Sequence, residues 1–378
     1  MVASFRDSEA TNALDKVFAV MSFMSFVGIP LPMEIDYAVS VKDLYTSVSS
    51  NQILTCKNNP EAYEPLAPLR FCREKNRYKT LPSWVVDWTS YPRNDDHIIS
   101  GFTRAPKLFP DMVPWLQIKP IPDEDQDART LECPTRMIGA TKYNAAEGIK
   151  GYSPSIFAAS NLTILALLGI SIGTVCEVIS FDQYRARKLA SMHESISKKE
   201  GRCRSGMVLR TLTADMLDKA VDWGRIDEFS DSLLTALEVA ERGLEEEKNN
   251  GTKLGLISLQ DGAMRAEKLI ITRYADLEER AKRNIAAAFV KQLGELMQWI
   301  GLMSKGNRLF VTDTGYVGLG GNGISPGDKL YILHQGRTPF VLRQSGSRFR
   351  LISECYVDGL MTGEAASLGL EPERIEIE

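Results

Sequence analysis

The C-terminal part of the chain alternates short apolar runs with dense turn residues, and this pattern restricts the possible folds more than any other feature. The β-branched and aromatic runs lie at 308–312, 329–333, 339–342 and 348–352. Residues of these types favour strands. The glycines, prolines and aspartates between them supply the backbone conformations that tight turns need. Strands this short and this closely spaced predict a small antiparallel β-barrel.

The rest of the chain adds helices, so the predicted fold class is α+β. A second β-branched stretch with an internal glycine, Ser160–Phe181, predicts two strands that complete the barrel. The barrel is then expected to comprise 160–181 plus 301–364. The intervening residues, 182–300, have helical periodicity and predict a large helical insertion that forms a separate lobe.

Two further regions precede the barrel. Apolar residues recur at helical spacing within 1–57, which predicts an N-terminal helix pair. Residues 58–159 contain many prolines that interrupt any long helix, and this composition predicts a loop-rich connector. Trp84, Trp88 and Trp115 are the expected anchors of this connector, because their large apolar area favours burial against the core.

Composition predicts a soluble globular protein. Of the 378 residues, 44% are hydrophobic and 25% are charged. The net charge of −4 gives no general attraction to phosphate, so nucleic-acid binding is not expected. The basic run at 198–204 is the best local candidate for such binding, and a solvated loop is its alternative interpretation. No secretory signal is expected from the N-terminal residues, and no apolar run is long enough to span a membrane, which predicts a cytoplasmic protein.

The cysteines and histidines predict no metal site. The six cysteines lack paired close spacing, and the three histidines, His97, His193 and His334, include no helix-spaced pair. Cys203 lies between two arginines and is either an ordinary loop thiol or a reactive one, since nearby positive charge favours the thiolate.

Residues Gly318–Gly323 satisfy the G-x-G-x-x-G spacing of dinucleotide-binding loops. That motif requires its last glycine to open a helix whose N-terminus faces the pyrophosphate. Here the following residues, 324–328, lead into another predicted strand. The glycines therefore predict a hairpin loop, and no cofactor is expected.

Two segments match the G-x-S-x-G spacing of serine nucleophiles, with Ser171 and Ser325 at their centres. The serine of that motif works on a sharp turn from a strand into a helix. Neither match precedes a predicted helix, so turn glycines explain both. Three acidic residues remain as acid–base candidates: Asp87, Asp313 and Glu354. The alternative is structural, with Asp87 bonding backbone groups of the connector and Asp313 bonding its own turn.

Several sequence blocks, in the same order, resemble fungal heterokaryon-incompatibility (HET-domain) proteins. The C-terminal blocks are 306–310, 315–320, 326–328, 339–343 and 354–361, and the upstream ones are 81–88 and 210–215. A further block, 15–19, resembles the last helix of the HET domain itself, with Asn-Ala-Leu at 12–14 where that family usually reads Asp-Pro-Arg. In full-length relatives the signature domain, a suspected relative of TIR domains, lies upstream of the position matching Asp15.

The resemblance implies that 1–57 is a remnant of the C-terminal helices of a HET domain and that the chain is a truncated family member or a shortened gene product. The implied function is a non-enzymatic interaction or regulatory role in self/non-self recognition and the linked cell-death response, with a protein partner and an undetermined oligomeric state. Catalytic residues remain unassigned. The alternative is an enzyme or accessory protein of fungal metabolism with a pocket between the helical lobe and the barrel.

Overall fold

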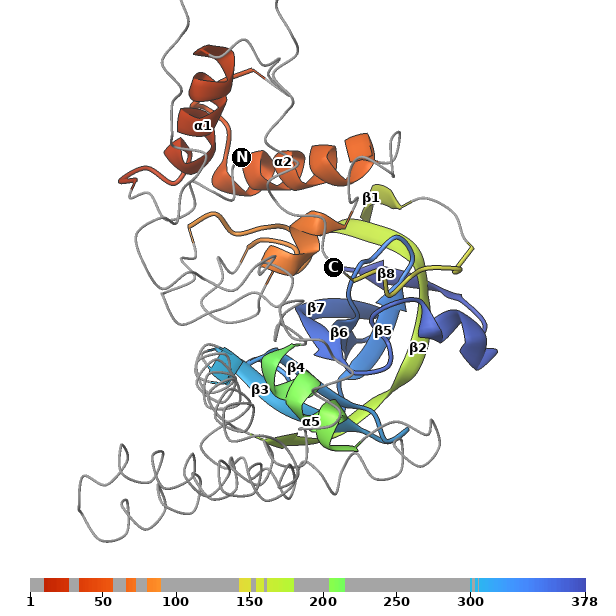
Figure 1. The fold of residues 1–378 in the computed structure, drawn as a ribbon. Coiled ribbons are helices and arrows are strands. Elements are labelled where there is room, and N and C mark those ends of the chain that lie inside the picture. Colours follow the sequence, from red (N-terminus) through yellow and green to blue (C-terminus); the bar gives the residue numbers. More distant parts are fainter. Residues whose placement is uncertain are drawn as a thin grey trace, which may run out of the picture.

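The protein combines helices with an eight-stranded sheet (Figure 1). The computed structural model describes residues 10–26, 34–56, 66–72, 80–89, 143–150, 154–159, 162–179, 204–214, 300, 303–304 and 306–378. The helical elements are α1 (Asp15–Phe26), α2 (Val41–Cys56), α5 (Arg204–Thr213) and the 3₁₀ turns η2 (Ala67–Phe71) and η6 (Glu364–Leu368). The strands are β1 (Ser155–Ala159), β2 (Leu162–Ile179), β3 (Asn307–Thr312), β4 (Val317–Gly321), β5 (Lys329–Leu333), β6 (Phe340–Ser345), β7 (Arg348–Val357) and β8 (Glu373–Ile377).

The two predicted N-terminal helices are present, and each begins at a side-chain cap. Asn12 Oδ1 accepts a hydrogen bond from the Leu14 amide at 3.0 Å, ahead of α1. Ser40 Oγ accepts from the Asp43 amide at 3.1 Å at the start of α2, which satisfies a donor that the helix leaves free. The Tyr45 hydroxyl of α2 donates to the Ala13 carbonyl at 2.7 Å. This bond joins the two helices.

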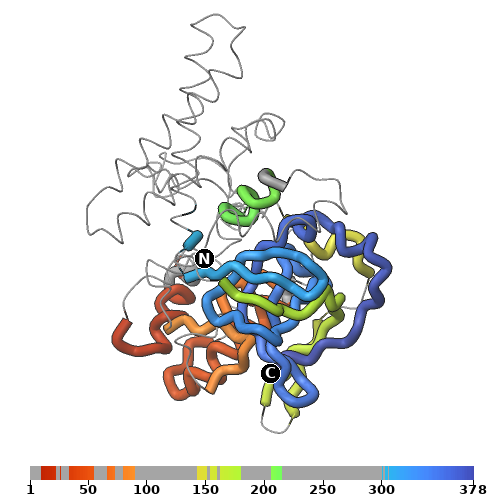
Figure 2. Tube along the Cα trace, turned by 90° about the horizontal axis from the view of Figure 1, so that it is seen from below, coloured from red at the N-terminus to blue at the C-terminus, as the bar shows by residue number. Residues whose placement is uncertain are grey.

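Six strands form a closed series of pairings that we call the strand ring. β2 pairs with β3, β3 with β4, β4 with β7, β7 with β6, β6 with β5, and β5 pairs again with β2. All of these pairings are antiparallel. The strands predicted at 308–312, 329–333, 339–342 and 348–352 correspond to β3, β5, β6 and β7. Figure 2 shows the ring with the helix pair to one side.

The prediction that Ser160–Phe181 supplies two strands is wrong. The segment forms one long strand, β2, which runs along the molecule in Figure 1. The features taken as signs of a hairpin correspond instead to two irregularities in register, between Ser171 and Gly173 and between Val175 and Glu177. A bulge bends a strand without ending it. β2 therefore pairs with β1 and β8 along its first half and with β3 along its second. β1 and β8 lie outside the predicted 160–181 and 301–364 barrel segments.

Two apolar clusters fill the described part of the molecule. The first packs α1, α2 and the tryptophans Trp84 and Trp88 against one end of the sheet, including Leu165 and Ile375. The second lies inside the strand ring and includes Phe310, Leu330 and Ile352. The helix pair and the sheet therefore share one continuous apolar interface, whose burial stabilises both.

The glycines of the G-x-G-x-x-G segment lie in a buried strand. Gly318, Gly320 and Gly321 belong to β4, so the prediction of a hairpin loop is correct only for Asn322 and Gly323. A Cβ atom on Gly318 would lie 2.4 Å from Phe310 Cζ and 2.8 Å from the Tyr356 carbonyl oxygen. Close packing of the strand against its neighbours explains why glycine is required there.

Gly318→Ala is expected to lower the free energy of unfolding by about 3 kcal/mol, because the added methyl group overpacks the ring. Urea denaturation measures this change. Gly346→Ala is the control, since a Cβ there meets nothing within 4 Å and the cost is the backbone strain at φ +61°, about 1–2 kcal/mol. If Gly318→Ala costs no more than the control, the packing explanation is wrong.

Most of the predicted helical lobe at 182–300 lies outside the described residues. Within it the structure describes 204–214, which include α5, and Ile300. Among the described residues, no helix is both long enough and apolar enough to cross a membrane.

Candidate functional site

The candidate site is the region between the helix pair and the strand ring, formed by residues 66–72 and 80–89, which we call the junction. Its segments form hydrogen bonds with α2, β2, β7 and the residue after β8. In Figure 1 the junction lies between α2 above and β7 below.

Ser83 connects the junction to two distant strands. Its hydroxyl accepts a hydrogen bond from the Leu351 amide of β7 at 2.8 Å and donates to the main-chain oxygen of Glu378, the residue after β8. The Ser83 amide also donates to that oxygen, at 2.8 Å. Since Ser83 is buried and both roles of its hydroxyl are used on backbone groups, it connects two strands.

The next residues bind β2 and α2. The Trp84 indole nitrogen donates to the Thr163 carbonyl of β2 at 3.1 Å, and the ring is fully buried. The Val86 amide donates to Ser49 Oγ of α2 at 3.1 Å. The predicted anchoring by Trp84 and Trp88 is confirmed by their burial, and Trp115 lies outside the described residues.

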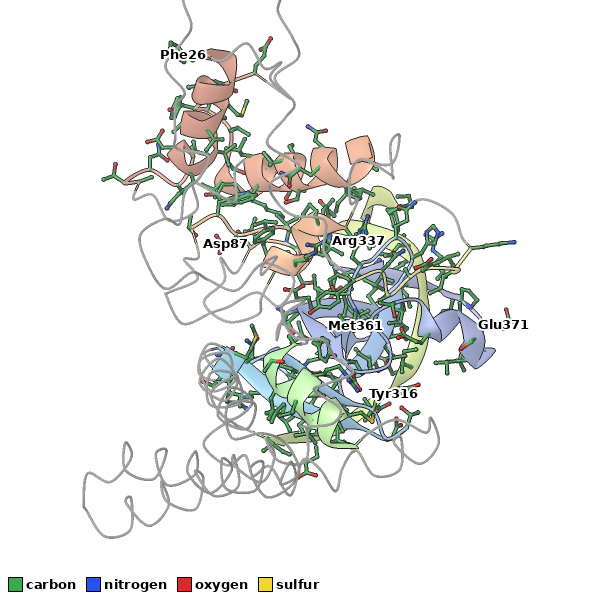
Figure 3. The ribbon with its side chains drawn as sticks, viewed as in Figure 1. Phe26, Asp87, Tyr316, Arg337, Met361 and Glu371 are labelled. Atoms are coloured by element: carbon green, nitrogen blue, oxygen red, sulfur yellow. The ribbon has the colours of Figure 1, made fainter. Side chains whose placement is uncertain are left out.

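A buried ionic cluster lies where η2 meets β7. Arg70 of η2 is 4% exposed and Glu354 of β7 is 1% exposed. Burial lowers the pKa of Arg70 to about 10, the negative charge of Glu354 opposes this shift, and the positive charge of Arg337 adds to it. The Arg70 guanidinium therefore stays charged near neutral pH. Figure 3 labels Arg337 between the helix pair and the ring.

Glu354 has a second polar neighbour within this cluster. The Thr338 hydroxyl donates to Glu354 Oε2 at 3.5 Å, and Thr338 is fully buried. Thr338 follows Arg337 in the β5–β6 loop, so the cluster joins η2, β7 and that loop. A carboxylate in such a place is stabilised by charge and hydrogen bonding. Its arrangement favours a structural role for Glu354 over acid–base chemistry.

A second ionic cluster connects α5 to the end of β7. Arg210 Nε donates to Asp358 Oδ1 at 2.9 Å, and the Tyr356 hydroxyl donates to the same oxygen at 3.1 Å. The Tyr143 ring lies 6.0 Å from the Tyr356 ring, and the Tyr143 hydroxyl donates to the Ala214 carbonyl. The blocks 210–215 and 354–361, separated by more than 130 residues, thus meet in space.

A third cluster orders the turn that precedes β5. Arg343 donates to both carboxylate oxygens of Asp328, from Nε at 2.8 Å and from Nη2 at 3.0 Å. Nη2 also donates to the Gly323 carbonyl at 2.8 Å, and Asp328 Oδ2 accepts from the Ser325 amide at 2.8 Å. Two-point pairing of this kind is the strongest geometry available to arginine and a carboxylate. It fixes the turn that contains Ser325.

Ser325 lies in a turn, as predicted, whereas the hairpin turn predicted around Ser171 is wrong. Ser171 lies within β2, and Ser325 lies in the turn before β5, so neither opens a helix. The prediction that neither G-x-S-x-G match leads into a helix is therefore confirmed.

The three acidic candidates contact different parts of the chain. Asp87 Oδ1 accepts from the Thr89 amide at 2.9 Å and from the Thr89 hydroxyl at 2.6 Å, so it bonds a backbone group of the connector as predicted. Asp313 does not bond its own turn as predicted, since Oδ1 accepts from the Thr174 amide of β2 at 2.8 Å. The turn brings the carboxylate across to β2 because β2 and β3 are paired there. Glu354 belongs to the junction cluster.

The remaining candidates are largely outside the described residues. His97, His193, Cys203 and nearly all of the basic run at 198–204 fall in those parts of the chain. His334 is described, and its amide donates to the Leu168 carbonyl at 2.8 Å. Within the described ranges, no three potential ligands among His, Cys, Asp and Glu group together around a metal position.

Sequence reasoning missed three arginines near buried carboxylates, of which Arg210 and Arg343 form ion pairs and Arg70 feels the charge of Glu354. Arg70, Arg210 and Arg343 each stand in a largely apolar or small-residue segment, where a charged residue requires a partner. That local signal identifies them as candidates for buried pairing. It does not identify Glu354, Asp358 or Asp328 as their partners, because those lie far away in sequence or on other strands.

Comparisons with known proteins give two matches. A family model described as the Het-6 beta-barrel domain matches residues 258–374. Heterokaryon incompatibility protein 6, OR allele, of Neurospora crassa is 36% identical over 66 residues, which are 16% of this chain and 10% of the length of that relative. No solved structure matches the chain. The C-terminal region of this chain is therefore that of a fungal heterokaryon-incompatibility (HET-domain) family protein, with a Het-6 β-barrel domain.

Proposed function

We propose that the chain is a non-enzymatic interaction or regulatory protein in fungal heterokaryon incompatibility, which acts through protein contacts in self/non-self recognition and the associated cell death. The match of residues 258–374 to the Het-6 beta-barrel domain carries this proposal. The name of the Neurospora crassa relative supports it. The chain acts in the cytoplasm on a protein partner and without a cofactor.

The chemistry of the buried groups also supports a binding role. Asp328, Asp358 and Glu354 neighbour arginines that lie on other elements, and Ser83 bonds backbone groups of two strands. Buried charges with such neighbours fix the positions of the elements that carry them. Breaking these interactions to free a group for catalysis would lower the stability of the fold. The polar residues of the blocks thus build a scaffold whose outer surface is free to contact other proteins.

The proposed architecture retains the domain limits expected from the sequence. The strand ring is the small closed barrel of residues 160–181 plus 301–364, extended by β1 and β8, and 182–300 is the helical lobe. Residues 1–57 contribute the helix pair and 58–159 the connector. The alternative of a metabolic enzyme requires a pocket between lobe and barrel, and most of that lobe lies outside the described residues.

Expression in a fungal host tests the proposal. The chain alone is expected to leave the growth of a compatible strain unchanged. Fusion of an expressing strain with non-expressing strains of different compatibility type is expected to change the fraction of dead fusion cells, scored by a vital dye. Ser171→Ala and Ser325→Ala should behave as the native chain, because neither hydroxyl takes part in the proposed role.

Two results would contradict a contact-based role. One is growth arrest caused by the chain alone that disappears in Ser325→Ala or Ser171→Ala, since this would indicate a reactive hydroxyl. The other is an unchanged fraction of dead fusion cells across all compatibility types tested. Immunoblotting of each variant controls for its abundance, because destabilised chains are degraded.

A further inference from the structure

We draw no further inference here: the strongest candidate, the exposed apolar side chains of Phe26 on α1 and of Ile35 and Tyr37 in the segment between α1 and α2, carries none because nothing in the structure shows what covers them.

Discussion

Trp84→Ala is expected to lower the free energy of unfolding by about 3–5 kcal/mol, the usual cost of removing a large aromatic side chain from a core. Trp84 is fully buried, and its indole nitrogen also donates to the Thr163 carbonyl of β2. The substitution leaves a cavity between the helix pair and the sheet, and it leaves that carbonyl without this donor. Urea denaturation followed by far-ultraviolet circular dichroism measures the loss.

Trp88 supplies a matched control for the hydrogen bond. It is 3% exposed, and within the described part of the chain its indole nitrogen has no hydrogen-bond partner. Trp84→Phe should therefore cost about 1 kcal/mol more than Trp88→Phe, the typical net contribution of one hydrogen bond. Equal costs for the two phenylalanine variants would contradict the role assigned to the Trp84 indole. A Trp84→Ala variant as stable as the native chain would contradict the claim that the junction stabilises the contact between the helix pair and the sheet.

Arg70→Met is expected to cost about 3–5 kcal/mol, because it leaves the Glu354 carboxylate buried without the positive charge of η2. Methionine retains much of the apolar stem of arginine, so the loss reports mainly on charge. Equilibrium unfolding in urea near neutral pH provides the measurement. At that pH the Arg70 guanidinium of the native chain is charged.

The double variant Arg70→Met, Glu354→Met distinguishes the interaction between these two charges from a general loss of packing in the junction. Replacing two buried, oppositely charged neighbours with apolar residues is often close to neutral, so the double variant is expected to regain most of the stability that Arg70→Met loses. Additive losses would show that the two residues act independently. In that case the ionic cluster would not connect η2 to β7.

The local elements could be predicted from the sequence because local signals specify them. The runs that became β3, β5, β6 and β7 are β-branched or aromatic and end at turn residues. The helices α1 and α2 follow apolar spacing and begin at asparagine and serine caps. The absence of a helix after Ser325 was also readable, since Pro326 and Gly327 favour a turn.

The failures arise where tertiary pairing overrides a local signal. Glycine and β-branched residues within 160–181 favour a hairpin locally, but pairing with β3, β5 and β8 along one strand keeps β2 continuous. β8 has the alternating pattern of a strand, but three of its five residues are charged. Its pairing with β2 and β7 explains why it nevertheless forms a strand. Gly318 signals a loop by composition, and only Phe310 and Tyr356 show that it is a packing position.

The candidate site was predictable in part. The burial of Trp84 and Trp88 and the structural role of Asp87 follow from residue type and context. The partners of the buried charges do not, because Arg70 and Glu354 are separated by 284 positions and meet only after the sheet has formed. Long-range ionic contacts of this kind carry no periodic signal in sequence.

The central claim is that the junction joins the helix pair, the strand ring and β8 into one stable unit. Native-state hydrogen exchange with mass spectrometry tests it directly, since the free energy of opening is measured segment by segment. Peptides covering 81–86, 349–352 and 373–378 are expected to open with similar free energies in the native chain, and to lose protection together in Trp84→Ala. Rapid exchange at 81–86 while 349–352 stays protected in the native chain would contradict the claim.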